Sequence, residues 1–142
     1  MPILNVKVSA PKSRETSAAI AGILLELTSR ILGKDPALTA IAIDYIDPDD
    51  WIVGGVPLSV QHKTSIYFDI KITDETNTKG EKARYIAEAF AAFEQLFGDL
   101  HQESYIHVQD VRAAAYGYGG RTQEFRYHAP AAQVRPDSCQ RS

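Results

Sequence analysis

The feature that most constrains the fold of this chain is an internal repeat of about 65 residues. Helix-spaced apolar residues occur twice, at Ile20, Leu24, Leu27 and Ile31 and again at Ile86, Phe90, Phe93 and Phe97. The flanking segments match as well: residues 5–8 with 69–72, Ile41 and Ile43 with Ile106 and Val108, and Trp51 and Gly54-Gly55 with Tyr116 and Gly119-Gly120. Because four elements match at a nearly constant offset, the sequence predicts two tandem copies of one supersecondary unit.

Each copy has the order strand, helix, strand. Residues 3–8 and 38–46 contain apolar-polar alternation, and the helix-spaced residues between them begin after Ser13, a cap residue, and end before Gly33. Residues 66–72, 78–97 and 105–111 repeat this order. Two strands joined by a crossover helix form a parallel pair. The predicted fold class is therefore α+β, with tandem β-α-β units forming a four-stranded sheet and two helices on one of its faces.

With 142 residues, the chain has room for one ordinary globular core. We expect a single domain over residues 1–128, made of repeats at about 2–55 and 65–120. Residues 129–142 contain two prolines, two arginines and few large apolar side chains, which predicts a flexible tail. Because apolar residues such as Val6, Val8, Ile41, Ile43, Ile70 and Ile72 are expected to be shared between both sheet faces, we expect another subunit to cover the open face.

Charge and cysteine content exclude several function classes. Lys plus Arg number 15 against 18 Asp plus Glu, so the formal net charge is -3, and no block of like charge interrupts the mixture. This balance argues against a dedicated nucleic-acid or membrane-surface protein. One cysteine and four scattered histidines lack the spacing of a structural zinc site. No export signal or membrane span is visible, so we expect a cytoplasmic protein without a metal.

Three features together carry a family resemblance: Pro2 directly after the initiator methionine, the β-α-β spacing, and residues 51–55 echoed by residues 116–120. On these features the chain resembles the tautomerase superfamily, specifically its fused members, in which two units like 4-oxalocrotonate tautomerase lie in one polypeptide. The resemblance spans about residues 2–120. It implies the fold shared with macrophage migration inhibitory factor (MIF), a homotrimer, a small carboxylate substrate and no cofactor.

Pro2 is the candidate catalytic residue. Removal of Met1 would leave Pro2 with a free secondary amine. An α-amino group has an ordinary pKa of roughly 7.7–8.0, and burial lowers it toward neutrality by disfavouring the charged form. A neutral amine can remove a proton next to a carbonyl and return it elsewhere, which requires no metal or organic cofactor. The alternative is that Pro2 merely begins a strand at a sheet edge, where its missing N–H is tolerated.

The resemblance also implies cations that bind substrate carboxylates. Lys12 stands where an arginine is usual in the family, and Ala42 stands where the family has a second-strand arginine. Arg112 and Arg14 are candidate replacements for the missing cation, and solvated surface positions are the alternative for both. The related dehalogenases have arginines early in the second unit, where this chain has Asp74 and Glu75. A halide-releasing hydrolase is therefore disfavoured.

Three further residues are candidates for substrate binding. Trp51 falls on the family's aromatic pocket position, and Tyr116 is its counterpart in the second unit. Both residue types are also common packing anchors at subunit interfaces. His107 occupies the place in the second unit that Ala42 has in the first, and a structural strand histidine is the alternative for it.

The leading hypothesis is a cofactor-independent tautomerase, an isomerase that uses Pro2 as a general base on a small 2-hydroxydienoate or 2-oxo acid. A proline-dependent decarboxylase or hydratase of the same superfamily is the alternative enzyme, in which Pro2 would act as a cation. A non-catalytic trimeric scaffold is the alternative of another class, since a fold alone does not confer activity. The sequence leaves the physiological substrate open, and also whether subunits share the site.

Overall fold

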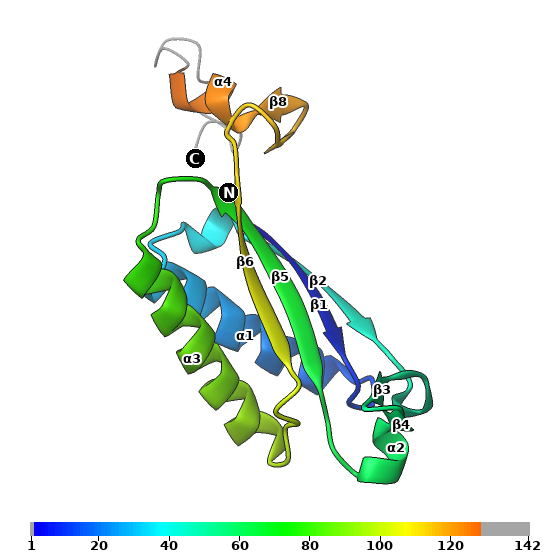
Figure 1. The fold of residues 1–142 in the computed structure, drawn as a ribbon. Helices are drawn as coiled ribbons and strands as arrows, with labels where there is room; N and C mark the ends of the chain where they lie inside the picture. The colour runs from blue at the N-terminus through cyan, green and yellow to red at the C-terminus, as the bar shows by residue number, and fades with distance from the viewer. Residues whose placement is uncertain (1, 129–142) are drawn as a thin grey trace.

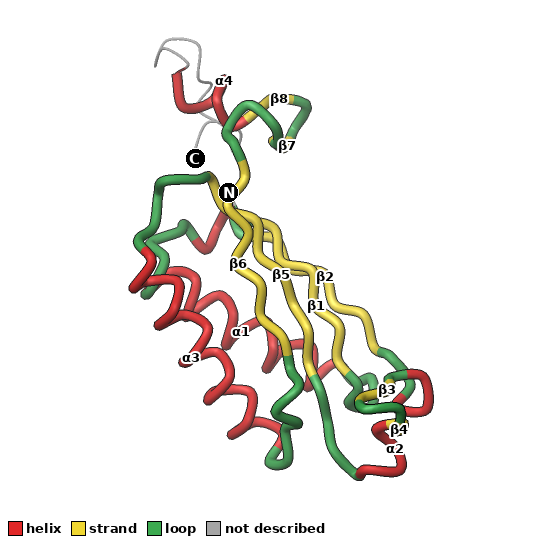
Figure 2. The backbone as a smooth tube through the Cα atoms, viewed as in Figure 1, coloured by secondary structure: helices red, strands yellow, loops and turns green. Residues whose placement is uncertain are grey.

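The computed structural model of this chain describes residues 2–128, so the tail expected at 129–142 lies outside the described residues. Four strands form the main sheet, in the order β2-β1-β5-β6 (Figure 1). Their bounds are β1 (Ile3–Val8), β2 (Ala40–Tyr45), β5 (Ile66–Thr73) and β6 (Tyr105–Val111). β1 pairs in parallel with β2, and β5 with β6. The antiparallel pairing of β1 with β5 joins the two units into one sheet (Figure 2).

Two helices, α1 (Arg14–Arg30) and α3 (Lys79–Phe97), cover the same face of this sheet (Figure 1). The Ser13 side chain accepts a hydrogen bond from the Thr16 backbone N–H at 3.0 Å, which satisfies an otherwise unpaired donor at the start of α1. Thr78 and Glu81 form a reciprocal capping box at the start of α3. The predicted α+β fold, with two helices on one face of a four-stranded sheet, is confirmed.

The core lies between the helices and the sheet. Phe68 of β5 packs edge-on against Tyr85 and Phe93 of α3, each with a ring separation of 6.2 Å. The buried stripe of α3 differs from the exact repeat, because Tyr85, Ala89 and Phe93 are buried while Ile86 is 39% exposed. α3 is therefore rotated by about one residue relative to the register that the repeat predicted.

The open face of the sheet carries polar side chains along with some apolar ones. The apolar residues expected to be shared between both faces all lie toward the helices: Val6, Val8, Ile70 and Ile72 are fully buried, and Ile41 and Ile43 pack against them. That expectation was wrong because the strand register places all these residues on the same side of the period-2 pleat.

A row of residues crosses the open face instead, made of Ala42, Asn5, Asp69 and His107. Most of these side chains can hydrogen-bond. Ile3 and Tyr105, which are 38% and 59% exposed, lie on the same face, so its apolar surface comes from residues other than those that the sequence singled out.

Each unit ends in a small hairpin followed by a short helix. The first comprises β3 (Ile52–Val53), β4 (Val56–Pro57) and α2 (Leu58–Gln61), and the second β7 (Gly117–Tyr118), β8 (Arg121–Thr122) and α4 (Gln123–His128). Both turns place two consecutive glycines at positive φ: 62° and 80° in the first hairpin, 63° and 80° in the second. Only glycine adopts this pair of conformations readily, which explains why the Gly-Gly pair recurs.

The two hairpins differ in how they meet the body of the molecule. Leu58 of α2 is fully buried, and Gln61 Oε1 is 2.9 Å from His101 Nε2 in the loop before β6. The second hairpin and α4 extend beyond the sheet with residues 112–116, and we call residues 112–128 the arm (Figure 1). Phe125 and Tyr127 of the arm are 46% and 84% exposed. No helix within residues 2–128 is long and apolar enough to cross a membrane.

The hydrogen bond between Thr28 and Tyr85 is a measurable link between the helices. Thr28 Oγ1 lies 2.8 Å from Tyr85 Oη, both residues are fully buried, and burial raises the pKa of Tyr85 to about 12. We predict that Tyr85→Phe lowers the free energy of unfolding by about 1–3 kcal/mol, because it leaves the Thr28 hydroxyl unpaired. Urea denaturation would measure this change.

Thr28→Val combined with Tyr85→Phe should recover most of that loss, because neither partner is then a buried unpaired polar group. Tyr127→Phe, at an exposed position, is the matched control and should leave the midpoint unchanged. If the loss of unfolding free energy in the double variant equals the sum of the losses in Tyr85→Phe and in Thr28→Val, the hydrogen bond does not couple the helices.

Candidate active site

Pro2 is buried and stands directly before the inner strand β1. Its carbonyl oxygen accepts a hydrogen bond from the backbone N–H of Ala40, the first residue of β2, at 3.1 Å. Ile3 lies opposite Lys71, so Pro2 lies toward the last residues of the antiparallel strand β5. A proline is tolerated at this first position because it needs no ladder N–H. Pro2 is thus fixed between two strands rather than at a sheet edge.

The carboxyl ends of β5 and β6 lie at the same end of the sheet as Pro2, because β5 runs antiparallel to β1. Tyr116 reaches back to this end: its phenol oxygen is 2.9 Å from Thr73 Oγ1 at the close of β5. Burial raises the pKa of the Tyr116 phenol, so it remains a neutral O–H group. Arg112 follows β6 directly and is exposed. Of the residues predicted from the sequence, Tyr116 and Arg112 therefore accompany Pro2.

Lys12 and Trp51 lie at the other end. β1 carries the chain away from Pro2 over six residues, about 20 Å at the usual rise per residue, before Lys12 is reached. Trp51 follows β2, which runs parallel to β1, so it lies at that far end too. Arg14, at the start of α1, is also there. Within one chain these three residues are remote from Pro2, and only a second subunit could bring them to it.

His107 lies in the middle of the open face, on the opposite side of the sheet from the helices. It is exposed and stands beside Asp69, whose carboxylate accepts a hydrogen bond from Lys71 Nζ at 2.9 Å. Ala42 stands at the opposite end of the same cross-strand row. His107 and Ala42 thus occupy equivalent positions in the two units, and neither lies at the Pro2 end of the sheet.

The structure adds Lys34, which the sequence analysis missed. Lys34 lies in the loop between α1 and β2, and this loop leads to Ala40 beside Pro2. Its Nζ donates to Thr76 Oγ1 at 2.9 Å, and Thr76 Oγ1 donates to the Thr73 carbonyl at 2.6 Å. Lys34 therefore reaches the end of β5 that neighbours Pro2. The β-α-β topology could have predicted this position. In a parallel β-α-β unit, the loop from the helix to the second strand lies at the end of the sheet where the first strand begins.

The environment of Lys34 is partly desolvated. Burial lowers the pKa of its ammonium group, and the carboxylates of Glu81 and Asp110 act in the opposite direction. Asp110 is itself bound by Lys82 Nζ at 2.5 Å. A cation with reduced hydration binds a carboxylate more strongly than a fully hydrated one does. Lys34 is therefore a candidate anion-binding group at the Pro2 end.

A cavity of about 600 Å³ lies between the loop that follows β5 and the arm. Thr73 and Thr76 line it from the loop, and they are the residues that bind Tyr116 and Lys34. Asp74, Glu75 and Glu124 also line it, together with Arg126 and His128 from α4. The cavity, the tyrosine and the lysine thus converge on the end of β5 next to Pro2.

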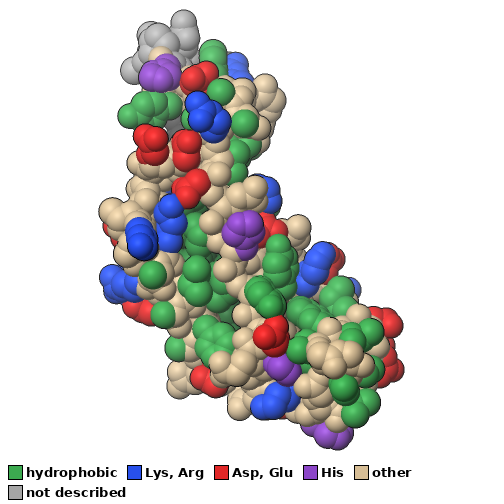
Figure 3. Space-filling model, in the orientation of Figure 1, with side chains coloured by type: hydrophobic (Ala, Val, Ile, Leu, Met, Phe, Trp, Pro, Cys, Tyr) green, Lys and Arg blue, Asp and Glu red, His purple; other side chains and the backbone are tan. Residues whose placement is uncertain are grey.

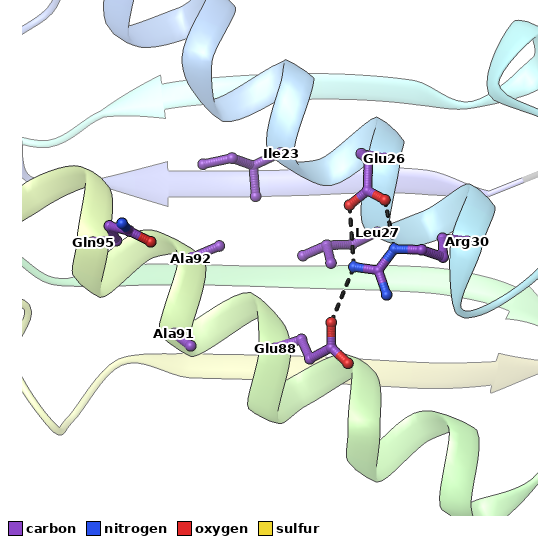
Figure 4. Close-up of a pocket in the computed structure, with 8 residues that line it drawn as sticks. All are labelled: Ile23, Glu26, Leu27, Arg30, Glu88, Ala91, Ala92 and Gln95. Carbon is purple, nitrogen blue, oxygen red and sulfur yellow. Dashed lines mark hydrogen bonds and ion pairs between the residues drawn. The ribbon is translucent and has the colours of Figure 1, made fainter.

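A second cavity, of about 300 Å³, lies between α1 and α3 (Figure 4). Arg30 dominates it, bound to Glu26 at 2.5 Å and to Glu88 at 3.0 Å, and Figure 4 shows all three side chains turned toward one another. The pKa values of both carboxyl groups are lowered, chiefly by hydrogen bonds from arginines. These ionisable groups are engaged in joining the helices, so we assign the cavity to helix packing.

Comparison with known proteins identifies the family. No family model matches this sequence. A curated protein, "Probable tautomerase K2" from Dickeya dadantii (strain 3937), is 32% identical over 60 residues, which cover 39% of this chain and 84% of that protein. The chain belongs to the tautomerase superfamily.

Solved structures agree with this assignment at the level of the fold. A fused 4-OT solved as a symmetric trimer matches this superfamily member with a TM-score of 0.71 and 16% identity, covering 86% of this chain and 96% of that one. A structure of Pt0534 inactivated by 2-oxo-3-pentynoate matches with a TM-score of 0.74 and 13% identity, covering 86% and 97%. The predicted resemblance to fused tautomerases is confirmed.

Proposed function

We propose that this tautomerase superfamily member is an isomerase in which Pro2 acts as a general base on a small 2-hydroxydienoate or 2-oxo acid. The observation that supports this most is the placement of buried Pro2 directly before the inner strand β1, at the end of the sheet where β5 closes with Thr73. Thr73 lines the cavity and lies 2.9 Å from the Tyr116 hydroxyl. Once Met1 is removed, the Pro2 nitrogen is a secondary amine rather than an amide. This amine is the base that the cofactor-independent reaction expected from the sequence requires.

The proton transfer has two steps. The neutral Pro2 nitrogen takes the proton of the substrate's 2-hydroxyl group, and the electron pair of that O–H bond forms the carbonyl while the diene shifts. The prolinium then returns its proton to a carbon of the chain, giving the 2-oxo isomer. Lys34 binds the substrate carboxylate in this proposal, and the Tyr116 hydroxyl lies at the same end of β5, 2.9 Å from Thr73 Oγ1.

Lys34 also favours the role of Pro2 as a general base over its alternative role as a protonated acid. A positive charge at this end of the sheet disfavours a second one, so in this proposal Lys34 favours the neutral Pro2 amine. A decarboxylase or hydratase would need the protonated form. Arg112 is a second cation at this end, and Lys12, Trp51 and His107 contribute only if another subunit presents them to Pro2.

The first prediction concerns Pro2 itself. We expect ketonisation of 2-hydroxydienoates, followed by ultraviolet absorbance, to fall by about 100-fold or more in kcat/KM in Pro2→Ala, because general-base catalysis contributes about that much. Protein that retains Met1, identified by intact mass, should be equally inactive because its Pro2 nitrogen is an amide. Equal rates in all three preparations would contradict the proposal.

A chemical probe supplies an independent readout of the same amine. The secondary amine should add to the triple bond of 2-oxo-3-pentynoate, forming one C–N bond, with its proton moving to the neighbouring carbon. No group leaves, so the mass should rise by one whole inhibitor molecule. Peptide mapping should place the label on Pro2 and find none on Met1-retaining protein.

The second prediction separates Lys34 from other lysines. Lys34→Gln should raise KM by about 10- to 100-fold with a smaller change in kcat, since a charge-assisted hydrogen bond is lost. Lys63→Gln, an exposed lysine in the loop before β5, is the matched control and should leave both constants unchanged. A large effect in Lys12→Gln with none in Lys34→Gln would instead assign the carboxylate to Lys12 of another subunit.

The third prediction concerns assembly. We propose a homotrimer, because a fused 4-OT that shares this fold is a symmetric trimer. Size-exclusion chromatography with light scattering should then give three times the 15.7 kDa mass of one chain. A particle with the mass of one or two chains would contradict the trimer while leaving the Pro2 prediction intact.

A further inference from the structure

A buried amide without a partner lies in the wall of the cavity between the loop after β5 and the arm. Gln123 lines this cavity of about 600 Å³ and is 7% exposed. Its Nε2 atom is buried and has no hydrogen-bond partner among residues 2–128. An unpaired buried donor destabilises a fold, so native proteins contain few of them. Gln123 therefore points to a partner from outside the described part of the chain.

The internal repeat shows that packing does not require a glutamine at this position. Gln123 stands 65 positions after Leu58, and each residue begins the short helix that follows its hairpin. The backbone N–H of each donates to the carbonyl of the aromatic residue seven positions earlier, at 2.9 Å in both units. Leu58 is apolar and fully buried. The second unit thus has a polar side chain where the first has a core residue, and such departures are expected at functional sites.

Acidic side chains line the same cavity. Asp74 is half-buried there, while Glu75 and Glu124 are exposed. Figure 3 shows acidic side chains gathered where the arm meets the body of the molecule. The ion pairs described within residues 2–128 involve none of these three carboxylates. Because they outnumber the basic residues of the lining, Arg126 and His128, the cavity favours a cation over an anion.

Gln123 and Asp74 belong to different walls of the cavity. Gln123 begins α4 of the arm, whereas Asp74 lies in the loop after β5. The Asp74 backbone N–H donates to the Val111 carbonyl at 2.9 Å, which ties this loop to the end of β6. A molecule in the cavity therefore has an amide donor on one wall and a negative charge on the other. The amide can turn its N–H toward such a molecule, because the terminal torsion of glutamine has broad minima.

We propose that this cavity binds a small organic molecule that carries both a primary ammonium group and a carbonyl oxygen. The ammonium group lies at the Asp74 carboxylate, and the carbonyl oxygen accepts a hydrogen bond from Gln123 Nε2. Tyr127, which lines the cavity and is 84% exposed, offers its ring to an apolar part of the ligand. Amino-acid amides have this chemistry, and the cavity volume suits a ligand of their size.

This binding site adjoins the candidate active site without including its proposed reactive groups. Thr73 and Thr76 line the cavity, but its lining contains none of Pro2, Lys34 and Tyr116. Binding of an amino-acid amide is therefore independent of the proton transfer proposed at Pro2. Loss of either activity leaves the other in place.

Three matched probes test the two polar contacts in full-length protein. Phenylalaninamide has the ammonium group and the carbonyl oxygen, phenethylamine lacks the carbonyl, and N-acetylphenylalaninamide lacks the ammonium group. In titrations followed by NMR, we expect phenylalaninamide to bind about tenfold more tightly than either of the others. Each of them loses one hydrogen bond or charge-assisted contact, and about one such contact accounts for a factor of ten.

Gln123→Leu gives the second unit the residue type of the first and separates binding from stability. Its affinity for phenylalaninamide should fall about tenfold, to the level of phenethylamine, while the urea midpoint stays the same or rises because a buried unpaired donor is gone. Asp74→Asn should weaken phenylalaninamide by a similar factor and leave N-acetylphenylalaninamide unchanged. Gln102→Leu, at an exposed glutamine in the loop before β6, is the matched control and should bind all three probes as the wild type does.

A readout on the wild type needs no variant. The side-chain NH₂ resonances of Gln123 should shift with phenylalaninamide and stay in place with phenethylamine. Equal affinity for all three probes, no binding of phenylalaninamide, or wild-type affinity in Gln123→Leu would each overturn the ligand site. If Gln123→Leu changes the particle mass by light scattering and leaves probe binding unaltered, the amide belongs to a contact between subunits and the ligand site is wrong.

Discussion

The antiparallel pairing of β1 with β5 determines where every candidate residue lies. In an isolated β-α-β unit, the loops near each strand end would all come from that same unit. Pairing the units head to tail brings the end of β5 to Pro2 and sends the end of β1 to the far side of the sheet. Tyr116, Thr73 and Thr76 thereby lie at the Pro2 end of the sheet although they belong to the second unit. The candidate site is thus shared between the repeats even within one chain.

The sequence predicted the elements well because their signals are local. Alternation marks the strands, and caps such as Ser13 and Thr78 mark the helix starts. The repeat then predicted the order of strands and helices. The rotation of α3, which buries Tyr85 and exposes Ile86, was not predictable this way, because it depends on how three aromatic rings pack together.

The site was less predictable because its residues come together through pairing between distant strands. Aligning each unit with the family pattern selected Lys12 and Trp51, which stand at the expected positions in the chain but at the far end of the sheet within one subunit. Lys34 has no motif around it. Its proximity to the Pro2 end follows from the course of the loop between α1 and β2 and from its bond to Thr76, 42 residues away. The polar character of the open face likewise depended on register, which a one-residue shift inverts.

The duplication also explains why the two ends of the sheet differ chemically. A polypeptide has one terminal amine, so under the proposed function only the first unit can supply an amine base. The equivalent place at the start of the second unit is Ile66, whose nitrogen is a peptide amide within β5. The far end, with Lys12 and Trp51, has therefore lost the base that would make it a second site of the same kind.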